Sequence, residues 1–128
     1  MSLTNSFETS VLTWLLTTGT PSPVRPTVWY LGLFTAAPGE AGGGTEISGS
    51  AYARQAITFT VSGDTASNNA ALEFPTATGS WGTVTHVAVF DALTTGNMIA
   101  YATLTASKVI DTGDVLRVPS GDLDITLT

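Results

Sequence analysis

Cysteine is absent from this sequence of 128 residues. The chain therefore has no disulfide framework, no thiol nucleophile and no cysteine-based metal site. Its stability must come from packing within the chain or against partner subunits. The mass of 13.2 kDa corresponds to one domain, which is large enough to bury a core.

Charged residues are also scarce, at 11% of the sequence. The chain has 10 acidic residues against 4 basic ones, which gives a net charge of -6 and a pI of about 4.2. Because nucleic-acid backbones are anionic, this sign of charge argues against nucleic-acid binding. Hydrophobic residues reach 43%, and Ser and Thr fill about a quarter of the chain, a composition that favours a folded β structure.

Long apolar runs are the third absence. No run approaches the ~18 apolar residues of a membrane-spanning helix, so we expect no membrane contact of that kind. The N-terminus opens without Lys or Arg, and Glu8 interrupts its apolar run, which argues against a signal peptide. We therefore expect the chain to remain in the cytoplasm in which it is made.

The first segment has the spacing of an amphipathic helix. Its apolar residues recur at intervals of three and four and so share one helix face: Leu3, Phe7, Val11, Trp14 and Leu15. Asn5 and Glu8 resemble a capping box, and Gly19 is a suitable stop, so we expect a helix over 5–17. The remaining positions are mediocre helix formers, so this helix should depend on docking.

A proline-rich linker follows the helix. Pro21, Pro23 and Pro26 cannot continue a helix and predict an extended segment. We therefore divide the chain into a docking arm at 1–26 and a β domain at 27–128.

Beyond the linker the hydrophobic period changes to two. About eight short strands, bounded by turn residues, are expected at 28–34, 53–61, 70–74, 83–90, 98–105, 108–110, 115–118 and 123–127. Segment 28–34 is apolar on both faces and predicts a central strand, whereas 83–90 and 98–105 should form a hairpin. Residues 35–50 hold three consecutive glycines and little that could pack, which predicts a mobile loop. The pattern is typical of a mainly β, antiparallel sandwich, jelly roll or small barrel with an N-terminal helix.

Two features could indicate catalysis. Asp111-Thr112-Gly113 follows an apolar pair, as a catalytic carboxylate does in aspartic proteases, but only fifteen residues follow the motif. A tight turn is the favoured interpretation.

His86 is the single histidine and shares strand parity with Val84, Ala88 and Phe90, which favours a half-buried structural role. No Gly-x-Ser-x-Gly elbow is present, and we predict that the protein is not an enzyme.

Acidic residues that could bind calcium occur in three pairs: Asp111 with Asp114, Asp122 with Asp124, and Glu40 with Glu46. None of them matches a calcium-binding loop, so solvated turn carboxylates are favoured. The glycines at 42–44 are not followed by the Gly-Lys-Ser/Thr of a phosphate loop. We therefore predict neither a metal nor a cofactor.

Aromatic residues could form a sugar-stacking platform or serve as core and interface anchors; they are Trp14, Trp29, Trp81, Tyr30, Tyr52 and Tyr101. Their spread over a helix, strands and a loop favours the second interpretation. Our candidate interface residues are Phe7, Val11, Trp14, Leu15, Glu46, Tyr52, Arg54, Trp81 and His86. Arg54 should project opposite Ile57 and Phe59 and contact another subunit, paired with Glu46 or Asp91. A local salt bridge is the alternative.

Several motifs carry a family resemblance: 30–35 (YLGLFT), 44–49 (GTEISG), 52–55 (YARQ), 74–75 (FP), 80–86 (SWGTVTH), 90–91 (FD), 96–97 (GN) and 113–114 (GD). From about residue 28 onward the chain resembles small virion proteins of tailed bacteriophages that are commonly labelled tail fibre proteins. The YARQ and WGTVTH segments are the most specific parts. The resemblance implies a structural part of a phage particle, with no catalytic residues to carry over.

Three roles follow as expectations. Our preferred hypothesis is a homo-oligomer, expected to be a trimer, that decorates or cements the capsid exterior and binds other virion proteins through many weak contacts. The alternative within the virion is a short tail-fibre or tail-tip protein that contacts a host surface glycan. The alternative from another class is a carbohydrate-binding module.

Overall fold

The computed structural model describes residues 1–127. One helix, α1 (Asn5–Leu16), lies near the N-terminus of this part of the chain. The strands are β1 (Ser2–Leu3), β2 (Trp29–Ala36), β3 (Thr45–Glu46), β4 (Gln55–Ile57), β5 (Phe59–Ser62), β6 (Thr65–Asn68), β7 (Leu72–Glu73), β8 (Gly82–Phe90), β9 (Met98–Ile110), β10 (Arg117–Val118) and β11 (Asp124–Thr126). Within residues 1–127, no helix is long and apolar enough to cross a membrane.

The main sheet has six strands in the order β1-β9-β8-β2-β3, and β4 pairs with β2 beside β3. All of these pairs are antiparallel, and the predicted hairpin is confirmed as β8 and β9. The expectation that 28–34 forms a central strand is also confirmed. Because β2 is hydrogen-bonded on both sides and covered on both faces, both sets of its side chains are apolar.

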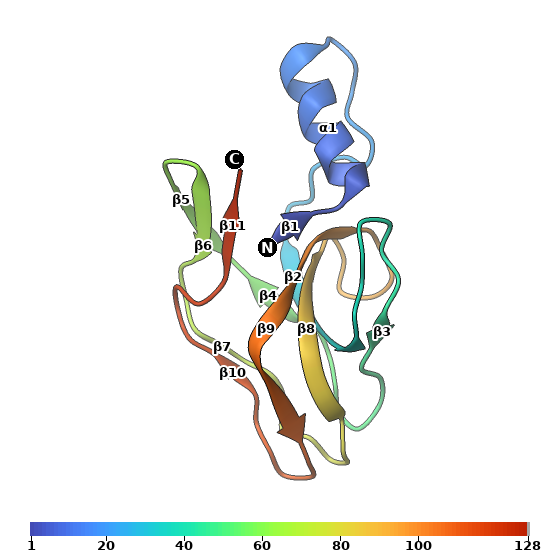
Figure 1. Ribbon diagram of the computed structural model, residues 1–128, viewed down its shortest axis with the longest axis vertical. Helices are drawn as coiled ribbons and strands as arrows, with labels where there is room; N and C mark the ends of the chain where they lie inside the picture. The colour runs from blue at the N-terminus through green and yellow to red at the C-terminus, as the bar shows by residue number, and fades with distance from the viewer. Residues whose placement is uncertain (128) are drawn as a thin grey trace.

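Two small antiparallel sheets lie over one face of the main sheet (Figure 1). One pairs β7 with β10, and the other has the order β11-β6-β5. The main core lies between the layers, where Leu31, Leu33 and Val87 of the main sheet belong to one cluster with Phe74 and Leu116 of the opposite layer. The predicted fold class is confirmed: the protein is mainly β and antiparallel, with an N-terminal helix.

A second, smaller cluster lies on the other face of the main sheet. It contains Phe34, Ala88 and Phe90, with Met98 and Tyr101 packed against it. The rings of Phe34 and Phe90 stack with centroids 6.0 Å apart. This cluster forms the floor on which the polar residues described below are assembled.

The strand predictions differ from the structure at several places, and β1, β3 and β6 were not predicted at all. The segments 98–105 and 108–110 form a single strand, β9, whose pairing with β8 is irregular between Val84 and His86. This irregularity places Val84 in the main core, whereas Ala88 belongs to the second cluster, so the simple strand parity proposed for His86 was wrong. The predicted strand 53–61 is broken into β4 and β5.

The predicted loop at 35–50 packs more than its glycines suggested. Thr45 and Glu46 form β3, and Ile47 is buried in the main core. The Glu40 carbonyl accepts a hydrogen bond from the Asn5 amide at the start of α1. The expectation that this segment holds little that could pack was therefore wrong, because local composition does not show which few side chains reach a core.

The helix begins as predicted but ends at Leu16, one residue early. The predicted capping box was wrong, because Thr4 occupies the N-cap position and its side chain makes no capping hydrogen bond. Instead, Thr4 Oγ1 donates to the Met98 carbonyl at 2.7 Å. The N-cap residue of the helix is therefore hydrogen-bonded to β9, and the linker at 17–28 runs without regular structure.

Asn68 is a buried polar residue that the sequence did not single out. It is 1% exposed, its Nδ2 donates to the Pro119 and Ala70 carbonyls, and its Oδ1 accepts from the Leu123 amide at 2.9 Å. Its side chain thus fastens the turn at 119–122 to β6. Buried polar groups persist where each has a partner, and here all of the side-chain partners are backbone groups.

We predict that Asn68→Ala lowers the free energy of unfolding by about 2–4 kcal/mol, because it leaves buried backbone groups without partners. Asn69→Ala is the matched control: its side chain bonds at the exposed surface, so a loss below about 1 kcal/mol is expected. Urea unfolding of both variants measures the difference. Equal losses would contradict the structural role assigned to Asn68.

Candidate functional site

The first candidate surface is the arm, defined here as residues 5–26, which comprises α1 and the linker. In Figure 1 the helix projects beyond the β layers, and the linker returns beside it. Phe7 is buried at 8% exposure, and the side chain of Ser10 is turned inward to the Pro23 carbonyl. Trp14 and Leu15, by contrast, are 69% and 61% exposed. Only the first half of the predicted apolar face is therefore covered by the chain itself.

An apolar groove runs between the helix and the linker. It has a volume of about 540 Å³ and is lined by Phe7, Val11 and Trp14 from the helix and by Pro23, Val24 and Trp29 among other residues. Val24 is 68% exposed. The arm therefore presents apolar side chains both in the groove and on the outer side of the helix.

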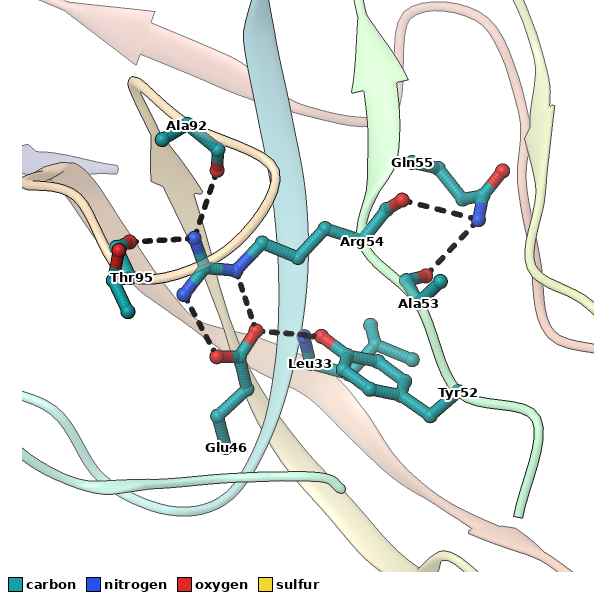
Figure 2. Close-up of polar contacts among 8 residues, drawn as sticks. All are labelled: Leu33, Glu46, Tyr52, Ala53, Arg54, Gln55, Ala92 and Thr95. Atoms are coloured by element: carbon teal, nitrogen blue, oxygen red, sulfur yellow. Dashed lines mark hydrogen bonds and ion pairs between the residues drawn. The ribbon is translucent and has the colours of Figure 1, made fainter. Parts of the chain in front are cut away.

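The second candidate surface is a polar cluster formed by Glu46, Tyr52 and Arg54 (Figure 2). The Arg54 guanidinium forms a two-point ion pair with Glu46, with Nε to Oε2 at 2.7 Å and Nη2 to Oε1 at 2.8 Å. Its Nη1 donates to the carbonyls of Ala92 and Thr95, each at 2.8 Å. The guanidinium carbon also lies 3.5 Å from the centre of the Phe90 ring.

This arrangement confirms the pairing of Arg54 with Glu46, and it places Arg54 on the face opposite the buried Ile57, as predicted. Arg54 is 8% exposed, so most of its contacts are made within this chain. The other proposed partner, Asp91, is engaged elsewhere: its carboxylate accepts from the amide and side chain of Asn97 and closes the β8–β9 loop. Arg54 therefore holds the conformation of the β8–β9 loop by donating hydrogen bonds to the loop carbonyls of Ala92 and Thr95.

Tyr52 joins the polar cluster to the sheet. Its hydroxyl donates a hydrogen bond to Glu46 at 2.8 Å and accepts one from the Leu33 amide at 2.9 Å. The hydroxyl therefore provides an acceptor for a backbone amide of β2 that lies beyond the end of β4. Its ring stacks on Phe74 and meets Trp81 edge-on. Burial, reinforced by the hydrogen bond to Glu46, raises the pKa of Tyr52 well above its ordinary value.

Gly32 provides the space for this cluster, a role that sequence analysis missed. A Cβ atom on Gly32 would lie 2.7 Å from Glu46 Oε2 and 3.2 Å from the Tyr52 hydroxyl. The apolar pattern of β2 had marked this residue only as part of a strand. A glycine inside a strand is a signal for close approach by another group, and here that group is a carboxylate.

The remaining predicted interface residues lie apart from the arm. Trp81 is 5% exposed, and its Nε1 donates to the Ser50 carbonyl at 3.0 Å. His86 is half-buried, and its Nδ1 lies 2.8 Å from Thr85 Oγ1. Of the candidates, Val11, Trp14 and Leu15 are the ones whose side chains remain exposed. Whether any of the nine lies at an interface stays a prediction.

The acidic pairs are used in turns and local bonds. Asp114 Oδ2 accepts from the Asp111 amide, and the Gly113 amide donates to the Ala77 carbonyl, so the Asp-Thr-Gly motif forms a turn. Asp124 accepts from Ser67, and Glu40 accepts from the Tyr101 hydroxyl at 2.5 Å. Among residues 1–127, no three acidic or histidine side chains are grouped as metal ligands.

The Tyr101–Glu40 hydrogen bond fastens the glycine-rich segment to β9, and it raises the pKa of Tyr101. The aromatic residues considered for sugar stacking are dispersed: Trp14 lies on the arm, whereas Trp81 and Tyr52 lie against the core. They do not share one exposed face.

We predict that Arg54→Ala lowers the free energy of unfolding by about 3 kcal/mol, because it leaves Glu46 partly buried and unpaired. Arg117→Ala is the matched control: its ion pair with Glu73 is long, at 3.9 Å, and more than 60% exposed on both sides, so a loss below about 0.5 kcal/mol is expected. Chemical unfolding of the two variants decides. A similar loss in both would show that burial does not strengthen the Arg54 pair.

We also predict that stability falls as pH rises above about 10, the ordinary pKa of tyrosine. Because the folded state raises the pKa of Tyr52, the unfolded chain loses this proton first, and the contribution is fully present only below that pH. Tyr52→Phe should be less stable at neutral pH but should show a shallower decline at alkaline pH. Unfolding free energies measured across the alkaline range test this, and an equal slope in both proteins would contradict it.

Comparison with known proteins gives the family. The family described as "Podophage GP4 fiber I protein gp80" matches residues 2–126, a range that includes the arm as well as the β layers. A comparison with curated proteins gave no match. The expected kinship with phage tail fibre proteins is therefore confirmed: the chain belongs to the podophage GP4 fiber I protein gp80 family and is a structural protein of a phage virion.

Proposed function

We propose that the chain is a fibre subunit of the virion and that its arm attaches it to a neighbouring subunit. The observation that carries this proposal is the apolar helix that projects from the β layers with most of its large side chains exposed. The fibre description of the family supports a position on the tail. The capsid-cement role that we preferred from the sequence has no such support and becomes an outcome of the test.

The physical reason for assigning attachment to the arm is the cost of leaving it free. A helix of 12 residues is marginal in water unless its apolar face is packed. In this chain only Phe7 and Ser10 of the helix are buried, whereas Leu12, Leu15 and Leu16 are each more than half exposed. A neighbouring subunit that covers these side chains would stabilise the helix and gain apolar contact area.

The β layers suit a supporting role without chemistry. The polar cluster is held by an ion pair, backbone carbonyls and an aromatic ring, and none of its groups is presented as a nucleophile or base. We therefore propose a non-enzymatic part, built into the virion as a homo-oligomer. We keep the proposed boundary between arm and β domain near residue 26, but the arm begins at residue 5, because Ser2–Leu3 pair with β9 in the main sheet.

The test is incorporation into virions. A phage that lacks this gene is grown in host cells that supply either the wild-type chain or Leu12→Gln/Leu15→Gln, a variant that keeps helix propensity but removes apolar contact. We expect virions to carry at least about tenfold less of the variant, by quantitative mass spectrometry. Leu93→Gln is the control, because Leu93 is 50% exposed but lies on the β8–β9 loop.

Immunogold labelling of the same virions locates the protein. Label at the tail supports the fibre assignment, whereas label over the capsid would overturn it in favour of a cement protein. Normal incorporation of the double variant would show that the arm is not the attachment site.

A further inference from the structure

We propose that the arm binds a second copy of this chain, with the leucine ridge of one copy lying in the apolar groove of the next. The ridge is Leu12, Leu15 and Leu16, and the groove is the space between α1 and the linker described above. The inference rests on the proposed function, in which the arm contacts a neighbouring subunit, and it identifies that neighbour.

The ridge has the geometry of a docking surface. Residues separated by three and four positions lie on one face of a helix, so the three leucines form one continuous apolar row. They are 57%, 61% and 72% exposed. Phe7 and Ser10, which are buried, lie on a different side of the same helix. The ridge is therefore not covered by its own chain, although Leu12 at its N-terminal end also lines a shallow pocket with residues of β1.

The groove offers a complementary surface. Trp14, Pro23, Val24 and Trp29 are among its lining residues, and its volume is about 540 Å³. Binding of a row of apolar helix residues in a hydrophobic groove is a recurrent mode of recognition. A ridge of three leucines matches a groove of this chemistry and size.

The extent of exposed apolar surface also fits a subunit contact. The exposed residues of the arm are Val11, Leu12, Trp14, Leu15, Leu16 and Val24. Together they present an area on the order of several hundred Å², comparable to the largest patch on a typical monomer, and the ridge and the groove each contribute a part of it.

The charges beside the two surfaces are complementary. Glu8 precedes Leu12 by four positions and Leu15 by seven, so it lies at the edge of the ridge, whereas Arg25 lines the groove. Both are exposed, and neither forms an ion pair within residues 1–127. When the ridge of one copy lies in the groove of the next, Glu8 of the first copy approaches Arg25 of the second, which favours self-association.

The ridge and the groove lie on different sides of α1, so one neighbour covers only one of them, and the contact is head-to-tail. Each copy uses its ridge on one neighbour and its groove on the other, so the assembly closes into a ring when the rotation between copies permits. A trimer, which we expected from the sequence, is the smallest ring of this kind.

The test uses the purified full chain and two variants with exposed substitutions. The ridge variant is Leu12→Gln/Leu15→Gln, the groove variant is Trp14→Gln/Val24→Gln, and Leu93→Gln is the control. Light scattering measures the solution mass, and circular dichroism confirms that each variant is folded. We expect the wild type and the control to be oligomers and each arm variant alone to associate about a hundredfold more weakly.

Mixing the two arm variants gives the decisive result. The groove variant still has an intact ridge, and the ridge variant has an intact groove, so the mixture should form a 1:1 complex. Loss of association in the ridge variant alone, with the groove variant unaffected, would indicate ridge-to-ridge packing and overturn the proposal.

A monomeric wild type would also overturn it. In that case, reduced virion incorporation of the ridge variant would still support attachment of the arm to a different virion protein. The two proposals can therefore fail separately.

Discussion

The buried guanidinium of Arg54 is the interaction on which one face of this fold depends. It links three segments: β3, which carries Glu46; the segment before β4, which carries Arg54 itself; and the loop between β8 and β9, which is distant from both in sequence. A cation with so little exposure is retained only where its donors are satisfied, and here four hydrogen bonds and the Phe90 ring meet that requirement. The absence of a Cβ at Gly32 leaves room for the carboxylate that completes the pair.

Other buried polar side chains of the β layers also have their hydrogen-bond partners within the chain. The Asn68 side chain hydrogen-bonds backbone groups at the turn 119–122, and the Tyr52 hydroxyl accepts from a backbone amide of β2. The Thr4 side chain donates to a carbonyl of β9 at the start of the helix. Within residues 1–127, no buried side-chain nitrogen or oxygen lacks a partner. The buried polar side chains of this part of the chain are therefore satisfied within the chain itself.

The arm has the opposite character. Its helix carries a single charged residue, and most of its large apolar side chains are exposed to solvent. The hydrophobic effect thus favours association through the arm and not through the polar cluster. In the role proposed above, the arm makes the contact with a neighbouring subunit and the β layers provide the folded support.

The sequence by itself determined the β class, the leading helix, the hairpin of β8 and β9 and the kinship with phage fibre proteins, because period, turn residues and motifs are local properties. It also offered Glu46 and Asp91 as alternative partners of Arg54, and the structure shows that the partner is Glu46. Tertiary structure alone decided which apolar residues are covered: Phe7 and Trp14 share one predicted helix face, yet one is buried and the other projects outward. It likewise decided the roles of Gly32 and Asn68, since these depend on groups brought together from distant parts of the chain. The hydrophobic period predicts which side chains form an apolar face, but only tertiary packing determines which of these side chains are buried within the chain and which remain exposed.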